Sequence, residues 1–456
     1  MRPPRSLAAA TLAVHATATT DCCGRLSRSL GDAVNFPGSG PYNATEASYW
    51  SLQESDLKPA CIVRPTRAQD VSKAMSIIGC TPQCKFAVKG QGHSPAAGFA
   101  NVDGGVTLDM TALASIETSS DLSVAKVGAG ASWIDVYRHL EPLGIAIPGG
   151  RNGNVGVGGL LLGGGISHFT TRVGWACDSI VNYEIALANG KLVNANRTSH
   201  PDLFRALKGG ASNFGVVTRF DLATFPQGNI SSTSLVHEIS QREAVLTAFA
   251  DIAGSNAFDP KASLVMGLLF NSTSRSWIMS TAAVYTEPVL HPSIYANLSS
   301  IPSVSNKSVI TSLATLADEA AMPPLNWLFA TATFKSSPAL LMDMFEALND
   351  TLYSFYPPGG IVWDVALEPL AGGMLSQSQS NADNVLGIGP GDNGFKECAQ
   401  AKGMLQRFQY LNYAAPYQNP LRSYGNQNLN FLRNIAASYD PKSIFQHRSG
   451  GGFKLT

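Results

Sequence analysis

A glycine-rich stretch over residues 148–165 constrains this chain more than any other part of its sequence. Nine of the eighteen residues are Gly, and apolar residues stand between many of them. A flexible linker would instead carry Ser and other polar residues between its glycines. The pair Gly156 and Gly158 lacks the further, correctly spaced Gly that a Rossmann dinucleotide fingerprint places at the start of its helix. The stretch therefore predicts an ordered segment whose backbone closely approaches a large, flat group.

A shorter stretch, Lys-Gly-Gln-Gly-His-Ser over residues 89–94, follows an apolar run that is typical of the end of a buried strand. Its two glycines permit positive φ and a close approach of the backbone to a ligand. Successive N–H groups in such a turn form a concavity that suits a pyrophosphate, and His93 stands at its mouth as a nucleophilic imidazole. The hexapeptide alone would be better explained as a turn with a hydrogen-bonded His. The second glycine-rich stretch favours the ligand site.

Together the two stretches resemble the FAD-binding domain of the vanillyl-alcohol oxidase/para-cresol methylhydroxylase type. The closer resemblance is to fungal members of the berberine-bridge-enzyme-like branch, and it extends from about residue 49 to the C-terminus. Residues 89–94 are similar to that branch's R-G-G-G-H-S/D element, with Lys89 in place of Arg and Gln91 in place of the middle Gly. The resemblance implies FAD as the cofactor, attached covalently to His93 through the flavin 8α-methyl carbon.

The same resemblance implies which residues contact FAD and how. Asn152 occupies the position where bicovalent members carry a Cys, so no cysteinyl link is expected. Val155 stands where a Val accompanies oxygen reactivity in this branch, although a core-facing Val is the simpler interpretation. Val217 lies in an element similar to one that packs beside the adenine half of FAD. The expected cofactor-binding residues are His93, Lys89, Gly90, Gln91, Gly92, Ser94, Gly98, Gly149, Gly150, Val155, Gly156, Gly158, Gly159, Gly163, Val217, Asn412 and Asn428.

The run Tyr-Leu-Asn-Tyr over residues 410–413 resembles the branch's Y-x-N-Y motif and carries the expected catalytic residues, Tyr413 and Tyr410. A free phenol has a pKa near ~10, so a basic Tyr requires a neighbouring positive charge or hydrogen bond. Tyr413 is the expected base. Without the resemblance, two Tyr three residues apart would more simply be packing residues. Asp364 and Glu368, on a predicted strand, are the alternative bases.

Composition and charge narrow the possible partners. Lys and Arg together number 32, equal to Asp and Glu together, and no basic run occurs, so we expect neither nucleic acid nor an anionic membrane as a partner. No apolar run has the length of a membrane span. We expect a small-molecule substrate, O₂ as the electron acceptor, no metal, and a monomer.

The N-terminus predicts entry into the secretory pathway. Residues 1–18 combine two Arg, a short apolar core and an Ala-Thr-Ala cleavage site, as a signal peptide does. Seven N-x-S/T sequons support a secreted glycoprotein; they begin at Asn43, Asn196, Asn229, Asn271, Asn297, Asn306 and Asn349. Five of the seven Cys precede residue 85, which predicts a disulfide from Cys22 or Cys23 to Cys80 or Cys84. Cys177 is expected to be a buried free thiol.

The alternation of elements predicts an α+β fold with a two-part FAD-binding domain and a substrate domain. The expected segments are a signal peptide at 1–18, an FAD-binding domain at 19–225, a substrate-binding domain at 226–405, and a C-terminal segment at 406–456 that completes the FAD-binding domain. Within 226–405 we expect helices at 243–252, 308–321 and 338–354 and strands at 263–270, 276–285, 327–334 and 361–368. An antiparallel sheet backed by helices should result.

Three functions are compatible with these features. The first is an oxidase that passes a hydride from an alcohol, amine or activated C–H of a small organic substrate, such as a fungal secondary metabolite, to flavin and then to O₂. The second uses the same site for oxidative cyclisation or dehydrogenation of a biosynthetic intermediate, or for oxidation of a carbohydrate. The third is a flavin-bearing binding protein without turnover.

Overall fold

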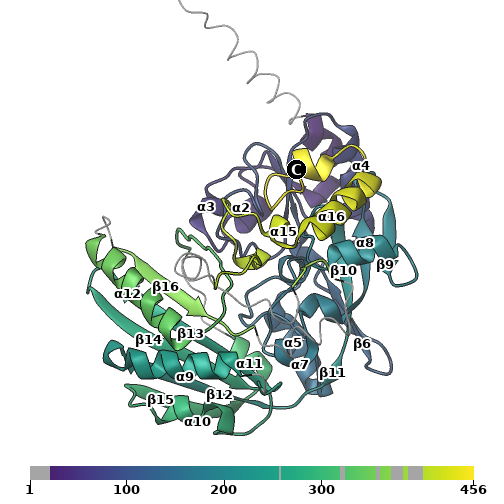
Figure 1. The fold of residues 1–456 in the computed structure, drawn as a ribbon. Coiled ribbons are helices and arrows are strands. Elements are labelled where there is room, and N and C mark those ends of the chain that lie inside the picture. The colour runs from purple at the N-terminus through teal and green to yellow at the C-terminus, as the bar shows by residue number, and fades with distance from the viewer. Residues whose placement is uncertain (1–20, 256–257, 319–323, 356–359, 371–383, 389–403) are drawn as a thin grey trace, which may run out of the picture.

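The structure, a computed structural model, describes residues 21–255, 258–318, 324–355, 360–370, 384–388 and 404–456. The expected signal peptide and Cys398 lie outside these ranges. Two hydrophobic cores are present. The first collects buried side chains between residues 22 and 230, at 284, 313–317 and 385–388, and from 408 to 455, and the second collects side chains between 235 and 367. Figure 1 shows the two parts of the molecule, with the C-terminal helices packed beside the N-terminal half.

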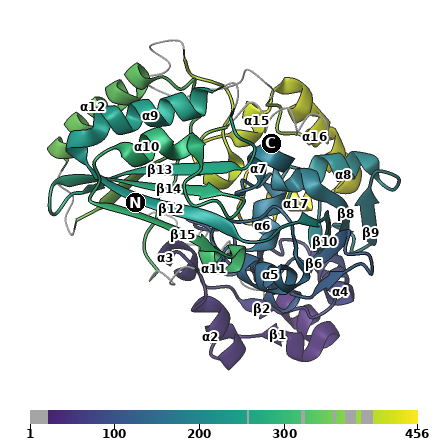
Figure 2. The same cartoon turned by 90° about the horizontal axis from the view of Figure 1, so that it is seen from below.

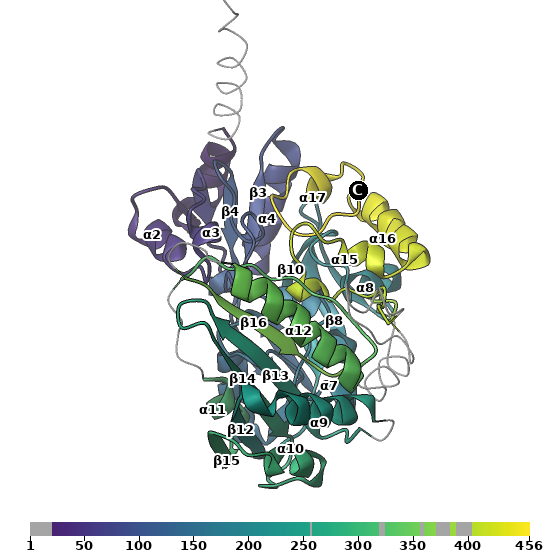
Figure 3. The ribbon, with the colours of Figure 1, turned by 60° about the vertical axis from the view of Figure 1, so that its left-hand side comes forward.

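The sheet whose strand β3 leads into the His93 turn has four strands in the order β1-β2-β4-β3. Its strands are β1 (Val34–Asn35), β2 (Cys61–Val63), β3 (Phe86–Lys89) and β4 (Val106–Asp109). Helix α4 (Ala68–Cys80) follows β2 and buries an i, i+3, i+4, i+7 stripe of apolar side chains. The backbone of Phe86 also exchanges hydrogen bonds with Arg448 and Gly450. The C-terminus therefore flanks the strand that leads to His93 (Figure 3).

Two disulfides join the N-terminal helix over residues 21–30 to this sheet. The Cys22–Cys84 bond confirms the expected link to the segment before β3. The Cys23–Cys61 bond was not predicted and joins the same helix to β2. Cys80 is free and exposed, and Cys177 is the buried free thiol that the sequence predicted.

The second sheet of the first core is antiparallel, with the order β5-β6-β10-β8-β9. Its strands are β5 (Ile116–Thr118), β6 (Val124–Gly128), β8 (Ile180–Ala186), β9 (Leu192–Asn196) and β10 (Val216–Ala223), and β7 (Ile145–Ala146) pairs separately with β11 (Phe225–Pro226). Its neighbouring helices are α5 (Trp133–Leu140), α6 (Val157–Leu162), α7 (Thr170–Val173) and α8 (Pro201–Leu207). The Ser132 side chain caps α5 by accepting a hydrogen bond from the Asp135 N–H.

The second core lies between helices and one face of a five-stranded antiparallel sheet, β15-β12-β14-β13-β16. The strands are β12 (Ile230–Glu238), β13 (Ala262–Asn271), β14 (Ser276–Tyr285), β15 (Ser305–Thr311) and β16 (Val362–Leu367). Figure 2 shows α9 (Arg242–Gly254), α10 (Ala296–Ser300) and α12 (Pro338–Ser354) on the same side of this sheet. This arrangement confirms the expected α+β class with an antiparallel sheet backed by helices.

Two predictions for this region were wrong. The helix expected at 308–321 does not begin at 308, because residues 308–311 belong to edge strand β15 (Ser305–Thr311). Only α11 (Leu313–Ala317) is helical among the described residues of 308–321. Residues 327–334 belong to no sheet ladder, and an isolated bridge joins Phe334 to Leu405. The conformation of both segments depends on contacts with residues that are distant in sequence.

The remaining elements connect or flank these layers. They are η1 (Gly31–Ala33), α2 (Gly40–Glu46), α3 (Leu52–Ser55), η2 (Met110–Ala112), η3 (Glu141–Leu143), η4 (Ala176–Ser179), η5 (Ile239–Gln241), η6 (Ser293–Tyr295), η7 (Leu411–Tyr413), α15 (Pro420–Ser423), α16 (Asn426–Tyr439) and α17 (Ile444–His447). Among the residues that the structure describes, no helix is long and apolar enough to cross a bilayer.

Candidate active site

The turn after β3 is tight around Gly92. This residue has φ +71°, and a Cβ at its position would lie 3.0 Å from the Tyr49 ring and 3.1 Å from the Lys89 side chain. A larger residue would therefore be strained by both conformation and space. The Gly92 carbonyl accepts a hydrogen bond from the Trp50 N–H. The turn consequently holds Trp50 and His93 close together.

The His93 imidazole stacks on the Trp50 indole, with ring centroids 4.3 Å apart and planes 18° from parallel. No hydrogen bond from the described part of the chain reaches its ring. Burial lowers the pKa of His93 to about 4, because the ring is largely shielded from the water that would stabilise its charged form. The imidazole is therefore neutral at physiological pH, which is the form with a nucleophilic nitrogen.

The two glycine-rich stretches that the sequence singled out lie against each other. A Cβ at Gly156 would come within 2.9 Å of the Gln91 backbone nitrogen. The Gln91 side chain crosses to the neighbouring segment and donates a hydrogen bond of 2.6 Å to the Gly130 carbonyl. Gln91, which departs from the branch's usual Gly, thus stabilises the turn.

Several of the expected cofactor glycines make room for groups of the protein itself. Cβ atoms at Gly149 and Gly150 would lie 2.1 and 2.6 Å from the ring of Trp133. At Gly158 the obstacle would be the Ala129 carbonyl at 3.1 Å, and at Gly163 the Asn412 side chain at 1.9 Å. The flat group that Gly149 and Gly150 approach is therefore an indole of the chain's own core.

Other glycines of the expected set face free space. A Cβ at Gly159 would meet no heavy atom within 4 Å, and at Gly90 and Gly98 the nearest atoms would be 3.8 and 4.0 Å away. Gly90 and Gly98 flank the neutral His93, and Gly159 lies on α6 of the other stretch. Open glycine backbone beside an uncharged imidazole is compatible with a large planar cofactor that binds there. These residues fit FAD.

Tyr410 is held by hydrogen bonds that its oxygen accepts. The Ile166 N–H donates at 3.0 Å and the Asn412 Nδ2 donates at 2.9 Å to its hydroxyl. Burial raises the pKa of Tyr410 well above its ordinary value. Asn412 also donates to the Leu160 carbonyl within α6. This pair positions the segment after Leu160 against the residues around Tyr413.

Tyr413 lies in a cluster with two charged side chains. Arg151 Nη2 donates to the Tyr413 hydroxyl at 2.7 Å and to Glu368 Oε1 at 2.5 Å. The Tyr413 hydroxyl lies 3.4 Å from the same Glu368 oxygen, to which it can donate. Burial raises the pKa of Tyr413 to about 12, an increase that the positive charge of Arg151 opposes and the negative charge of Glu368 adds to. The sequence predicted that Tyr413 would need a positive neighbour but did not identify Arg151.

The Arg151–Glu368 ion pair joins the two parts of the molecule. Arg151 belongs to the glycine-rich stretch, whereas Glu368 follows edge strand β16 of the second sheet. Both side chains are largely buried, with 18% and 14% of their surface exposed. His168 lies near Arg151 and contacts Ser263 of β13 at 3.2 Å. Burial and then the charge of Arg151 lower the pKa of His168 to about 3, so this ring also stays neutral.

The other expected site residues occupy less distinctive places. Lys89 is buried, with its ammonium 5.2 Å from the centroid of the Tyr49 ring. Ser94 accepts a hydrogen bond from the Ala96 N–H, and Val217 is buried in β10. Asn428 on α16 accepts a hydrogen bond from Arg205 of α8, a helix-packing contact.

Val155 packs against the first core, and its carbonyl accepts a hydrogen bond from the Trp133 N–H.

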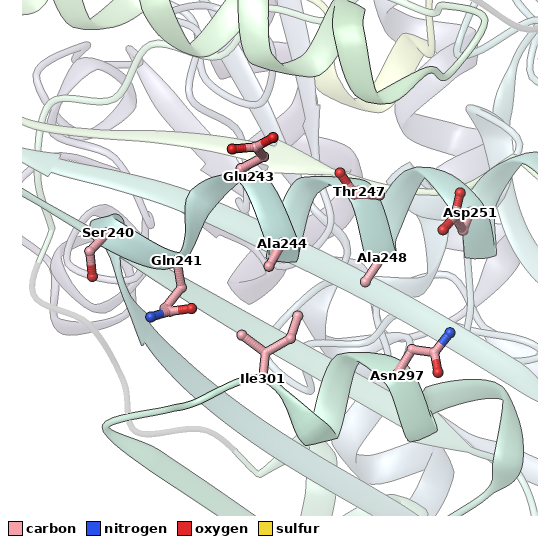
Figure 4. A pocket seen from close by; sticks show the side chains of 9 residues that line it. All are labelled: Ser240, Gln241, Glu243, Ala244, Thr247, Ala248, Asp251, Asn297 and Ile301. Carbon is pink, nitrogen blue, oxygen red and sulfur yellow. The ribbon is translucent and has the colours of Figure 1, made fainter.

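Over the described ranges, no three His, Cys, Asp or Glu side chains gather as metal ligands would. A groove of about 600 Å³ lies between α9 and α10 (Figure 4). Glu243, Thr247 and Asn297 are among its lining residues, and the lining includes neither His93 nor any member of the Tyr413 cluster.

Comparison with known proteins agrees with this arrangement. Residues 59–196 match a family described as an FAD binding domain. The chain is 34% identical to the FAD-dependent monooxygenase tpcD of Cochliobolus heterostrophus, over 96% of this chain and 94% of the relative.

Two solved structures show the same fold at lower identity. Xylooligosaccharide oxidase from Myceliophthora thermophila superposes with a TM-score of 0.77 at 20% identity, covering 96% of this chain and 99% of the oxidase. Glucooligosaccharide oxidase from Acremonium strictum, described with a 6-S-cysteinyl, 8α-N1-histidyl FAD, gives a TM-score of 0.74 at 21% identity, covering 95% and 99%.

The fold and site define an FAD-binding protein of the para-cresol methylhydroxylase type with a second, antiparallel sheet beside its cofactor domain. The chain belongs to the berberine-bridge-enzyme-like family and is an FAD-dependent oxidoreductase. Enzymes of this kind act on small molecules.

Proposed function

We propose that the chain is an FAD-linked oxidase that removes a hydride from an alcohol, amine or activated C–H of a small organic substrate. O₂ would then take the electrons and form H₂O₂. The observation that carries the proposal is the buried cluster of Tyr413, Arg151 and Glu368. Hydride loss from an alcohol or amine leaves a cation unless a proton also departs, and this cluster can accept that proton.

Bound FAD would supply the hydride acceptor. Tyr413 takes the substrate proton on its hydroxyl oxygen while its own proton can move to Glu368 Oε1, 3.4 Å away. Arg151 donates to both oxygens and stabilises negative charge on either one. The high pKa of Tyr413 means that the phenol is protonated at rest, so transfer through it to the carboxylate avoids a free tyrosinate.

The proposed attachment is a single bond between His93 and the flavin 8α carbon. A neutral imidazole flanked by open glycine backbone favours this bond. Asn152 supplies no thiol for a second link, and its Oδ1 accepts a hydrogen bond from the Asn154 N–H. The protein would bind FAD along the open backbone at Gly90, Gly98 and Gly159.

Further parts of the proposal concern organisation and compartment. The FAD-binding domain would comprise 19–225 and 406–456, and the substrate domain 226–405. The two disulfides near the N-terminus favour an oxidising compartment and hence secretion. The protein would act as a monomer.

A second candidate, insertion of oxygen into the substrate, is favoured by the name monooxygenase that the fungal relative carries. The two reactions differ in the destination of oxygen. An oxidase places both atoms of O₂ in H₂O₂, whereas a monooxygenase places one in the product and one in water. Turnover of a panel of aromatic alcohols and oligosaccharides under ¹⁸O₂, with peroxide measured in parallel, tests the proposal. Label in the product without stoichiometric peroxide would contradict it.

A further inference from the structure

A segment whose Phe334 packs against the second core extends to Trp50, beside His93. We call residues 324–334 the crossing segment. Its Leu325 carbonyl accepts a hydrogen bond from the Leu52 N–H, and Leu325 forms an isolated parallel bridge with Ser51. The crossing segment is therefore attached to the residues that immediately follow Trp50.

Two glutamine side chains fix the crossing segment at two further points. Gln53 donates to the Trp327 carbonyl at 2.6 Å and accepts from the Trp327 N–H at 3.1 Å. Gln418 does the same at Thr331, at 2.7 and 2.9 Å. A primary amide has both a donor and an acceptor, so it can pair with a peptide unit as a neighbouring strand would. Each clamp determines where the adjoining side chains lie.

The first clamp places Trp327 in a column of three rings. Trp327 stacks on Trp50 with centroids 4.7 Å apart and planes 5° from parallel. Trp50 stacks in turn on His93 at 4.3 Å. The Phe329 ring makes T-shaped contacts with the rings of Trp50 and Tyr413, with centroids 5.6 and 6.4 Å apart. Because His93 has no hydrogen bond from the described residues, we take its stack on Trp50 as the interaction that orients its imidazole.

We propose that Trp50 and Trp327 are positioning residues for covalent flavin attachment, and that the crossing segment thereby makes attachment depend on the second core. The inference rests on the proposed His93 linkage. In that bond an imidazole nitrogen gives an electron pair to the 8α carbon, which loses a proton. The two electrons of the broken C–H bond remain on the flavin ring and must pass to an electron acceptor. The proposed O₂ can take them and form H₂O₂. Reaction requires the nitrogen lone pair to point at that carbon, and ring orientation decides this.

The experiment measures the covalent fraction, which is flavin that stays with acid-precipitated protein divided by all flavin bound beforehand. Purified protein is incubated with excess FAD in air, and this fraction is followed over time. We expect Trp327→Ala and Trp50→Leu to lower the rate by roughly twofold to tenfold, the range that one aromatic contact corresponds to. Trp327→Phe should restore most of the rate. Leu328→Ala, at an exposed position of the same segment, is the matched control and should match wild type.

Further variants keep the outcome decisive if the Trp variants fold poorly. Gln53→Ala loosens the clamp at Trp327 without removing a ring, and should also slow attachment. Gln418→Ala loosens the more distant clamp and should have the smaller effect. Wild-type rates in Trp327→Ala and Gln53→Ala would overturn the inference, as would equal slowing in Leu328→Ala. If wild type itself releases all flavin into acid, the proposed linkage fails, a result distinct from failure of the stacking argument.

Discussion

The two ends of the candidate site are held by different forces. At one end His93 is neutral, lacks hydrogen bonds from the described residues and is oriented by stacking on Trp50. At the other end Tyr413 is fixed by an ion pair and short hydrogen bonds. Phe329 contacts both ends, being edge-on to Trp50 and to Tyr413. Stacking leaves a nitrogen lone pair available for a bond, whereas a charged cluster can hold and release a proton. The difference agrees with the proposed attachment at one end and the proposed proton transfer at the other.

The strongest test of the His93 end is His93→Ala. Since the neutral imidazole is the proposed attachment point, the variant should keep no flavin after acid precipitation. Its FAD should be found entirely in the supernatant, while wild type stays yellow in the pellet. Peptide mapping of wild type should show one linkage, on the His93 peptide. Flavin on a Cys peptide, or flavin retained by His93→Ala, would show that the attachment site is wrong.

The corresponding test of the other end is Tyr413→Phe. The change removes only the hydroxyl, so packing should survive and covalent flavin should be unchanged. General-base assistance is typically worth ~10²–10⁴-fold in rate, so we expect flavin reduction by substrate to slow by at least about a hundredfold. Anaerobic stopped-flow measures this step.

Tyr410→Phe is the control, because the Tyr410 oxygen accepts its hydrogen bonds from Ile166 and Asn412, whereas the Tyr413 oxygen accepts one from Arg151. It should have the smaller effect. If flavin reduction is slowed strongly in Tyr410→Phe and is normal in Tyr413→Phe, the base is Tyr410. If both react normally, Glu368 and Asp364 become the candidates.

The two ends also differ in how far the sequence could predict them. The strand before His93 and the turn itself follow from a local apolar run and two glycines, and β3 lies where it was expected. Arg151 was missed because its partners are 217 and 262 residues away, and nothing local distinguishes it from a surface Arg. A prediction from local pattern finds a turn but not an ion pair between two distant segments.

The wrong element predictions have the same origin. Residues 327–334 are rich in aromatic and β-branched side chains and suggested a strand, yet their backbone is paired largely by the Gln53 and Gln418 side chains. Residues 305–311 are strand β15 because β12 offers its edge to them. In both cases tertiary hydrogen bonds, which local propensity does not encode, decided the structure.

Opposite shifts in the pKa of Tyr413 would sharpen the electrostatic half of the comparison. Removing the Arg151 cation in Arg151→Met should raise this pKa above about 12, and removing the Glu368 anion in Glu368→Gln should lower it. A charge at this range shifts a pKa by about 1–3 units. Ultraviolet titration of tyrosinate, subtracting the same variant with Tyr413→Phe, measures both shifts without a substrate.

The controls for this titration guard against unfolding. Arg151→Met leaves a buried carboxylate unpaired, which is destabilising, so the double variant with Glu368→Gln removes both charges. The pKa of Tyr413 in the double variant should lie between its values in the two single variants. Arg138→Met breaks an exposed Arg–Asp pair at Asp318 and should change nothing. Shifts in the same direction for both single variants would contradict the cluster's proposed electrostatics.

The smallest expected effect concerns Val155, which lies between the two ends on one continuous stretch. Arg151 of that stretch contacts Tyr413, and Gly156 packs on Gln91 beside His93. Val155→Leu adds one methylene without changing charge, so neither the proton cluster nor the ring stack should respond. If Val155 borders the path of O₂ to the flavin, reoxidation of reduced enzyme in air should slow while reduction by substrate stays unchanged. Val155→Ala, which widens the same place, should reoxidise at least as fast as wild type. Equal reoxidation in all three proteins would remove Val155 from the oxygen path, and slower reduction in Val155→Leu would show that the residue supports one of the two ends instead.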